Sequence, residues 1–237
     1  MCTVTIVPYD DGFRLVCNRD ERCDRPAAIP PRARLLRRRT AIYPQDPLGG
    51  GTWVGANDSG LVAALLNRSV DAGTPSGERP FRSRGLIIPQ LLDAGSVTEA
   101  VDMAADLDPA RFNPFRLLVL QRMVVCVLTS DGLTLSVETP GETRPLMLTS
   151  SSLGDGVVFA PRRRLFEQLV MQRDDAWLQG QADFHDHQWP LRPEVSVRME
   201  RSDARTVSRT IIDVTSRAIE LDYHPLDVRE RRAGRAG

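Results

Sequence analysis

The order of elements in the sequence predicts an α+β fold, in which two mainly antiparallel sheets pack face to face and helices cover them. Three observations support this prediction. Strand-like segments come first, helix-like segments follow, and both kinds return in the second half of the chain. Two early pairs of strands are joined by hairpin-type turns. Later apolar segments have the short spacing of an antiparallel meander.

Two hairpins are predicted near the beginning of the chain. Residues 2–7 are rich in Thr, Val and Ile, and residues 13–17 form the return strand after an Asp-Asp-Gly turn. The end of the second strand would then lie beside the start of the first. In the second hairpin, one strand ends at the turn that begins with Asn57 and the other ends at Asn67.

The segment between the two hairpins contains two patterns that could be read as binding sites. Five arginines lie within residues 32–39, but no aromatic residues alternate with them, so we expect a solvated loop. Three consecutive glycines at 49–51 lack the residues that complete a phosphate-binding loop. Close backbone packing near a functional site is the better interpretation of these glycines.

Two helices are predicted after a polar loop at residues 71–80. Residues 83–92 form the first helix, with Pro89 either at its start or at a kink. Ser96 and Glu99 form an S-x-x-E capping box, which predicts the beginning of the second helix.

The second half of the chain is predicted to contain strands, then helices, then strands. The meander comprises residues 115–120, 123–129, 133–137 and 146–149. Pro161 is expected to open a helix, a further helical segment lies around residues 174–182, and strands follow at 195–199 and 206–213. We assign residues 1–228 to one domain and residues 229–237 to a disordered tail.

The composition excludes several classes of function. The formal net charge is zero, which argues against nucleic acid or an anionic membrane as a partner. The longest apolar run, residues 123–128, is too short to span a bilayer. All 31 basic residues are arginine, which excludes Schiff-base chemistry on lysine and a P-loop lysine. We interpret the absence of lysine as a GC-rich, bacterial coding bias.

The four cysteines are Cys2, Cys17, Cys23 and Cys126. No secretory segment precedes them and no CxxC pair is present, so we expect reduced thiols and a cytoplasmic protein.

Metal and serine-hydrolase sites are not indicated. His185 and His187 flank Asp186, but no matching further ligands are evident, so an exposed loop is the better interpretation. The sequence contains neither GxSxG nor HExxH.

The strongest chemical signal is at the start of the chain, where Cys2 follows Met1. Cysteine is small enough to allow removal of the methionine, which would leave an α-amine and a thiol on one residue. The amine titrates at about 7.7–8.0 and the thiol at about 8.5, so either group can be tuned to work near neutral pH. An amine beside a nucleophile is an established means of activation.

Cys2 is accompanied by three further motifs: Asn-Arg-Asp-Glu at residues 18–21 with Arg-Pro at 25–26, Gly-Gly-Thr-Trp-Val-Gly at 50–55, and Asn67. With these motifs the chain resembles the NRDE family, the TANGO2-like (transport and Golgi organisation 2) proteins. That family is similar to the N-terminal nucleophile (Ntn) hydrolases, particularly the branch with bile-salt hydrolases and penicillin V acylase. The resemblance implies a four-layer αββα sandwich in which residue two is the nucleophile.

The candidate catalytic residues are Cys2, Arg19, Asp20 and Asn67. Cys2 would attack an amide or thioester carbonyl, and its α-amine would relay the proton. Arg19 would favour the thiolate or neutralise an anion, and Asp20 would hold the α-ammonium or orient Arg19. Asn67 could donate to a tetrahedral oxyanion. The structural alternatives are an ion pair between Arg19 and Asp20 and a turn role for Asn67.

The candidate substrate-binding residues are Asn18, Trp53, Ser151 and Arg205. Trp53 is either core or a pocket wall. The hydrolase branch has a second asparagine and a late arginine. A serine, assigned here to Ser151, stands where the asparagine is expected. Arg205 and Arg209 are both candidates for the arginine.

Two functions remain open from the sequence, and a scaffold with a vestigial site is a further alternative. The first is a cysteine amidohydrolase or acyltransferase that acts on C–N bonds other than peptide bonds, or on a thioester, without a required cofactor. The second is a non-catalytic ligand-binding or trafficking protein that carries haem, acyl-CoA or a lipid in the same pocket, with Cys2 as a thiolate ligand or pocket lining. A small molecule is the expected partner in both, and the sequence predicts no oligomeric state.

Overall fold

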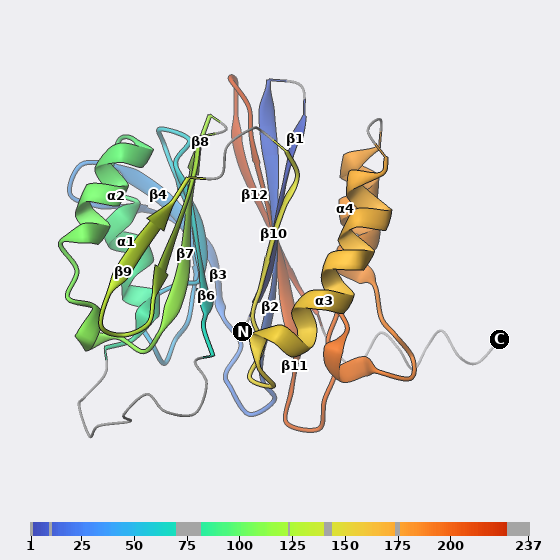
Figure 1. Ribbon diagram of the computed structural model, residues 1–237. Coiled ribbons are helices and arrows are strands. Elements are labelled where there is room, and N and C mark those ends of the chain that lie inside the picture. The colour runs from blue at the N-terminus through green and yellow to red at the C-terminus, as the bar shows by residue number, and fades with distance from the viewer. Residues whose placement is uncertain are drawn as a thin grey trace.

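The chain folds into four layers in the order helices, sheet, sheet, helices (Figure 1). The structure is a computed structural model that describes residues 2–9, 11–69, 82–122, 124–139, 144–173 and 176–226. A seven-stranded and a five-stranded sheet, both antiparallel, pack against each other (Figure 1). The predicted α+β fold with two packed sheets and helical covers is therefore confirmed. No helix of the described residues is long and apolar enough to cross a membrane.

The five-stranded sheet has the strand order β10-β1-β2-β11-β12. Its central hairpin is the first one predicted from the sequence, and chain segments from the second half flank it on both sides. The strands are β1 (Cys2–Tyr9), β2 (Gly12–Arg22), β10 (Leu146–Thr149), β11 (Ala204–Val214) and β12 (Ile219–Pro225).

The seven-stranded sheet runs in chain order from β3 to β9. The predicted second hairpin forms β5 and β6, and most of the predicted meander forms the last three strands. The strands are β3 (Ile29–Leu35), β4 (Thr40–Gln45), β5 (Val54–Asn57), β6 (Val62–Asn67), β7 (Phe115–Gln121), β8 (Val124–Ser130) and β9 (Leu135–Glu138).

Helices cover the outer face of each sheet (Figure 1). A short 3-10 turn, Arg84–Leu86, leads into α1 (Ile87–Leu91), and α2 (Val97–Ala105) lies beside α1 on the seven-stranded sheet. On the five-stranded sheet lie α3 (Asp155–Phe166), which continues as a π-helical turn at Glu167–Met171, and α4 (Trp177–Asp186).

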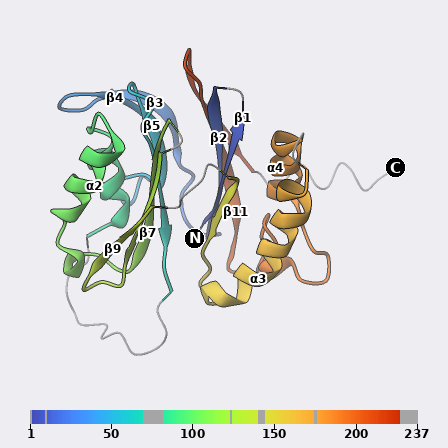
Figure 2. The same cartoon turned by 45° about the horizontal axis from the view of Figure 1, so that its top comes forward.

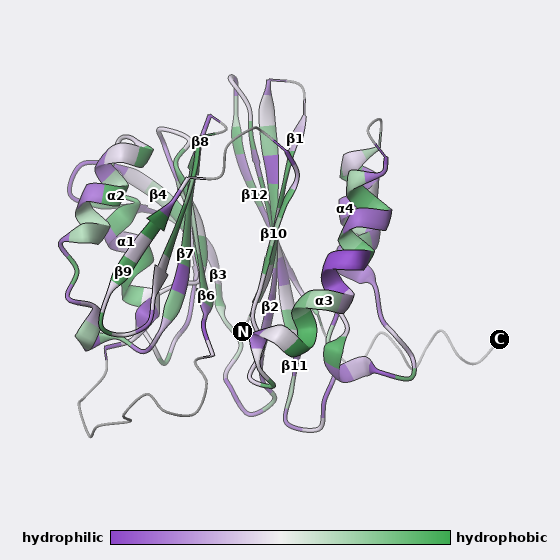
Figure 3. Cartoon of the chain, viewed as in Figure 1, coloured by the Kyte–Doolittle hydropathy of each residue, from purple (hydrophilic) through white to green (hydrophobic). Residues whose placement is uncertain are grey.

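Three apolar clusters fill the spaces between these layers. One lies between the two sheets and includes Val4, Leu15, Val54, Leu66 and Ile212. The second joins the seven-stranded sheet to α1 and α2, and the third joins the five-stranded sheet to α3 and α4. Hydrophobic segments accordingly run along the central strands of both sheets (Figure 3). Burial of apolar area on this scale is the main term that stabilises the fold.

The predicted capping box at the start of α2 is confirmed. The Ser96 hydroxyl accepts a hydrogen bond from the backbone N–H of Glu99 at 3.2 Å. The Glu99 carboxylate in turn accepts from the backbone N–H of Gly95 at 2.6 Å. One of the N–H groups that a helix leaves unpaired at its start is thereby satisfied, and the carboxylate also pairs with the N–H of the residue before the cap.

Two segment predictions are wrong, one of them in part, and each has a physical reason. The arginine-rich segment at 32–39 is a loop only at residues 36–39, because residues 29–35 form β3 and pair with β4. Edge strands tolerate such charge because one side faces solvent. The segment at 146–149 does not extend the meander, because β10 crosses to the other sheet and pairs with β1.

The prediction that Pro161 opens a helix is also wrong. α3 begins at Asp155, and Pro161 lies inside it. No strand forms at 195–199, because the backbone carbonyls of Val195 and Ser196 accept hydrogen bonds from the Arg162 side chain instead of from a neighbouring strand. The predicted loop at 71–80 and tail at 229–237 lie outside the described residues, as do Asp174 and Asp175 of the predicted helical segment.

Candidate active site

Cys2 is the first residue of β1 and lies directly opposite Arg19 in the β1–β2 pairing. Side chains alternate between the two faces of a strand. Cys2 therefore shares the face of Val4 and Ile6, which pack into the core between the two sheets. The start of the chain lies between the sheets in both views (Figures 1 and 2).

A pocket of about 330 Å³ opens beside Cys2. Its walls include four of the residues predicted from the sequence, which are Cys2, Arg19, Trp53 and Asn67. These four come from β1, β2, the loop before β5 and the end of β6. The pocket is therefore lined by residues of both sheets. The volume is at the lower end of the range for small-molecule sites.

Arg19 is held against the pocket wall by three contacts. Its guanidinium stacks over the Trp53 ring at 4.2 Å from the centroid. Its Nη2 atom lies 3.3 Å from a carboxylate oxygen of Glu21 and 3.3 Å from one of Asp46. Arg25 contacts the same two carboxylates, at 3.6 Å and 2.5 Å. Two arginines and two carboxylates thus form one closed network.

Asp46 organises this network from the loop after β4. Burial opposes its ionisation, but the hydrogen bonds from Arg25 and from the backbone N–H groups of Gly49 and Leu48 hold the pKa of Asp46 below its usual value. Asp46 is therefore an anion that fixes the position of both arginines.

The Cys2 sulfur is paired with the Cys17 thiol, which lies on the same face of the neighbouring strand. The hydrogen bond from Cys17 lowers the pKa of Cys2 and burial opposes this. The positive charges of the N-terminus and Arg19 lower the pKa further, against the negative charge of Asp20, which raises it. The pKa of Cys17 is raised well above its usual value by the same hydrogen bond and by burial. Cys17 is therefore the proton donor of the pair and Cys2 is the group that ionises first.

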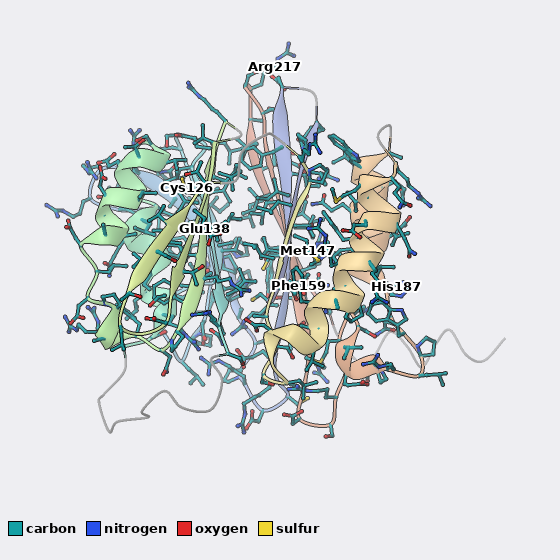
Figure 4. The ribbon with its side chains drawn as sticks, viewed as in Figure 1. Cys126, Glu138, Met147, Phe159, His187 and Arg217 are labelled. Carbon is teal, nitrogen blue, oxygen red and sulfur yellow. The ribbon has the colours of Figure 1, made fainter. Side chains whose placement is uncertain are left out.

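Replacement of Cys17 should make Cys2 a weaker thiolate. In a Cys17→Ala variant the sulfur of Cys2 loses its donor, so its pKa rises and the midpoint of its alkylation by iodoacetamide moves to higher pH. The rate at neutral pH falls accordingly. The measurement is the pH dependence of alkylation at Cys2, read by peptide mass spectrometry. Cys126→Ala, in the distant strand β8 (Figure 4), should leave the midpoint unchanged, and an unchanged midpoint in Cys17→Ala would contradict the assignment.

Ser150, and not the predicted Ser151, lies against the Cys2 backbone. The Cys2 nitrogen donates to the Ser150 Oγ atom at 3.2 Å, and the Ser150 N–H donates to the Cys2 carbonyl at 3.0 Å. Ser151 instead supports the turn before α3: its N–H donates to Asp155, and its hydroxyl accepts from Leu153. Ser151 is not among the residues that line the pocket.

Asn18 and Asp20 lie on the opposite face of β2 from Arg19. The Asn18 amide donates to the carbonyls of His185 and Val197, at 2.8 Å and 3.2 Å, in the layer beneath α4. The Asp20 carboxylate accepts from the Thr206 hydroxyl at 2.6 Å. Burial raises the pKa of Asp20, against the opposing effects of Arg162 and the N-terminal charge.

The two late arginines occupy different faces of β11. Arg209 donates to Asn18 and forms a bidentate pair with Asp186 at 3.0 and 2.7 Å, on the side of the helices. Arg205 lies opposite Glu21 in the sheet, and its Nε has no hydrogen-bond partner among the described residues. Neither arginine lines the pocket.

The interpretation of residues 185–187 as an exposed loop is wrong for His185. It is fully buried in the last turn of α4, where its Nε2 atom lies 2.7 Å from the Thr5 hydroxyl. Burial, with Arg209 and Arg162 nearby, lowers its pKa well below the usual value, so it is a neutral structural residue. Within the described ranges, no three His, Cys, Asp or Glu residues are grouped to hold a metal.

The predicted close packing at the glycines is confirmed at Gly51. A Cβ atom there would lie 2.2 Å from the backbone carbon of Gly85. This approach brings the segment that contains Arg84 against the loop before β5, and both segments line the pocket. The backbone N–H of Thr52 donates to the Gly85 carbonyl at 3.0 Å and fixes the contact.

Sequence reasoning missed several pocket residues, notably Asp46, Arg84 and Asn113. All three lie in loops or at the edges of short helical turns, where no periodic pattern indicates which side chains converge. The glycines at 49–51 indicated a close backbone approach, but only the structure shows that the partner is Gly85, next to Arg84.

Comparisons with known proteins agree with this architecture. The sequence profile of the family described as Transport and Golgi organisation 2 (TANGO2) matches residues 1–181. No curated protein sequence matches the chain.

Solved structures with a similar fold include the following three. A Caenorhabditis elegans ortholog of N-acylethanolamine-hydrolyzing acid amidase (NAAA) has a TM-score of 0.59 and 16% identity, over 89% of this chain and 92% of that one. Penicillin V acylase from Agrobacterium tumefaciens has a TM-score of 0.52 and 12% identity, over 95% and 86%. A variant of conjugated bile acid hydrolase from Clostridium perfringens has a TM-score of 0.50 and 12% identity, over 95% and 92%. At such identities the likeness is one of fold.

Proposed function

This chain belongs to the Transport and Golgi organisation 2 (TANGO2) family and has the fold of the Ntn hydrolases, and from these premises we propose that it is a cysteine amidohydrolase or acyltransferase. Its nucleophile is Cys2 after removal of Met1, and its substrate is a small amide or thioester. One observation carries the proposal: the Cys2 sulfur, with its pKa lowered, lies in a pocket of about 330 Å³. The three structurally similar proteins are named as an amidase, an acylase and a hydrolase, which favours this class.

The reaction begins with attack by the Cys2 thiolate on the carbonyl carbon. The new S–C bond converts the carbonyl into a tetrahedral oxyanion. Asn67 lines the same pocket, and none of the described residues hydrogen-bonds to its side-chain amide, which is therefore free to donate to that oxyanion. A donor in this position is typically worth about 2.7–4 kcal/mol of transition-state stabilisation.

Collapse of the tetrahedral species breaks the bond to the leaving group, which needs a proton. The Cys2 nitrogen becomes a free amine once Met1 is removed, and it lies 3.2 Å from the Ser150 hydroxyl. The amine takes up the thiol proton and transfers it to the departing nitrogen or sulfur. Water or an acceptor amine then attacks the thioester between Cys2 and the acyl group, and the thiol is regenerated.

Arg19 has a supporting role. Its charge favours the Cys2 thiolate, while Glu21 and Asp46 keep the guanidinium beside Trp53. Because both carboxylates are already engaged with arginines, neither is free to act as the proton acceptor for Cys2.

Acyl transfer to Cys2 tests the proposal directly. The intact mass of the purified protein is measured by mass spectrometry before and after brief exposure to p-nitrophenyl butyrate. We expect the mature protein to lack Met1 and to gain one butyryl group that maps to Cys2. Cys2→Ala should gain none, and Cys23→Ala, which removes an exposed thiol, should behave as wild type.

Retained Met1 with no adduct at Cys2 would contradict the proposal. The α-amine would then lie one residue away from the thiol, and proton transfer by this route would be lost. That outcome would favour ligand binding without turnover, and titration with haem and with acyl-CoA would follow.

A further inference from the structure

The charges that line the pocket do not balance. Four arginines and two carboxylates contribute to its walls, and the remaining lining residues are uncharged apart from the Cys2 thiol. Arg19 and Arg25 are engaged with Glu21 and Asp46 in the closed network. Two cations, Arg82 and Arg84, remain without a described carboxylate partner.

Arg84 is the more informative of the two because it is partly buried, whereas Arg82 is exposed. Arg84 begins the 3-10 turn Arg84–Leu86, and the contact between Gly51 and Gly85 holds this turn against the pocket. A guanidinium removed from water without a carboxylate is costly, unless another anion completes its environment.

The Arg84 guanidinium has more hydrogen-bond donors than the described residues engage. Its Nη1 atom donates to the Pro114 carbonyl at 2.8 Å. No other hydrogen bond links its guanidinium to a described residue, so Nε and Nη2 are left for a ligand. These two atoms form the planar fork that matches the two oxygens of a carboxylate.

Arg84 and the reacting residue Cys2 line the same pocket of about 330 Å³. Burial lowers the pKa of Arg84, and the negative charges of Cys2 and Glu21 act against this. An anion bound there would lie near the scissile carbonyl.

We propose that Arg84 forms an anion subsite and that the substrate attacked by Cys2 carries a carboxylate, bound by the Nε and Nη2 atoms of Arg84. The claim that the bound anion is part of a substrate rests on the proposed function. The anion subsite itself requires only the pocket and its unpaired guanidinium.

The first test compares two alkylating agents that differ in charge. Iodoacetate carries a carboxylate, iodoacetamide is its neutral counterpart, and both react with the same Cys2 thiolate. The ratio of the two rates therefore cancels any change in the pKa of Cys2. Relative to N-acetylcysteine, the wild-type ratio should favour iodoacetate about tenfold or more, because charge-assisted hydrogen bonds to the guanidinium hold the anionic reagent in the pocket.

The variants separate the subsite from general electrostatics. Arg84→Met should bring the ratio down to that of N-acetylcysteine, and Arg84→Lys should retain part of the preference because the charge is kept without the fork. Arg217→Met removes an exposed arginine at the opposite end of the sandwich (Figure 4) and should leave the ratio unchanged. Equal ratios for wild type and Arg84→Met would overturn the subsite.

A second measurement does not need a reactive thiol. N-acetylglycinate and N-acetylglycinamide are matched anionic and neutral amides, and their effects on the thermal unfolding temperature are compared at millimolar concentrations. The anionic amide should stabilise the wild type more than the neutral one, and this difference should vanish in Arg84→Met. If Cys2 reacts with neither alkylating agent, the comparison of unfolding temperatures decides whether the anion subsite exists. A preference for the anion without an acyl-enzyme would leave the subsite intact and reject the proposed hydrolysis.

Discussion

Cys2→Ala should abolish turnover while the protein remains folded. Loss of the nucleophile removes the covalent route altogether, and we expect the rate on an acyl amide or thioester to fall by roughly 10³-fold or more. The oxyanion donor and the rest of the pocket remain, so residual binding of substrate should survive. Steady-state kinetics on the substrate found by screening, with kcat and KM determined separately, is the measurement.

The fold of this variant should be close to that of the wild type. Cys2 is 4% exposed at the first position of a strand, and alanine keeps its backbone hydrogen bonds with Ser150. Removal of one sulfur costs about 1 kcal/mol of unfolding free energy, the usual size for a small buried truncation. Cys126→Ala is the matched control, because it truncates a buried thiol in another sheet. Equal turnover in Cys2→Ala and wild type would show that the nucleophile is elsewhere.

The sequence predicts the hairpins better than the sheets. β1 with β2 and β5 with β6 are local pairs whose turn residues mark them, and the structure contains both. The pairing of β1 with β10 joins residues 140 or more positions apart, and no local pattern encodes it. Strand β4 was not predicted because its short segment lacks a clear alternation of apolar and polar residues, whereas β12 does alternate and its signal was missed.

The site residues that lie on β-strands could be placed from the sequence. Cys2 and Arg19 share one face of the β1–β2 hairpin, and strand parity alone places Asn18 and Asp20 on the other. The predicted interaction between Arg19 and Asp20 did not take that parity into account. The Arg84 side chain reaches the pocket from a 3-10 turn and the Asp46 side chain from a loop, and only the packed structure brings them there.

The layer on the far side of Cys2 depends on a single buried cation, Arg162 in α3. Its side chain is 1% exposed, and its guanidinium donates to the Val195 carbonyl at 3.0 Å and the Ser196 carbonyl at 2.6 Å. It also donates to the hydroxyls of Thr3 at 2.8 Å and Thr149 at 2.6 Å, the residues that adjoin Cys2 and Ser150. Arg162 therefore links α3, the two strands at the site and the segment after α4.

Arg162→Met should destabilise the fold more than any other change considered. Methionine fills a similar volume but leaves two buried carbonyls without donors and removes the cation that opposes the rise in the pKa of Asp20. Unsatisfied buried groups cost about 1–3 kcal/mol each, so we expect a loss of roughly 3–5 kcal/mol in the free energy of unfolding by urea. Arg163→Met, on the next residue, breaks only a half-exposed pair with Glu167 at 2.6 Å and should cost less than about 1 kcal/mol. A loss from Arg162→Met no larger than that of its neighbour would mean that the carbonyls find other donors. The strands beside Cys2 would then be positioned by the sheet alone.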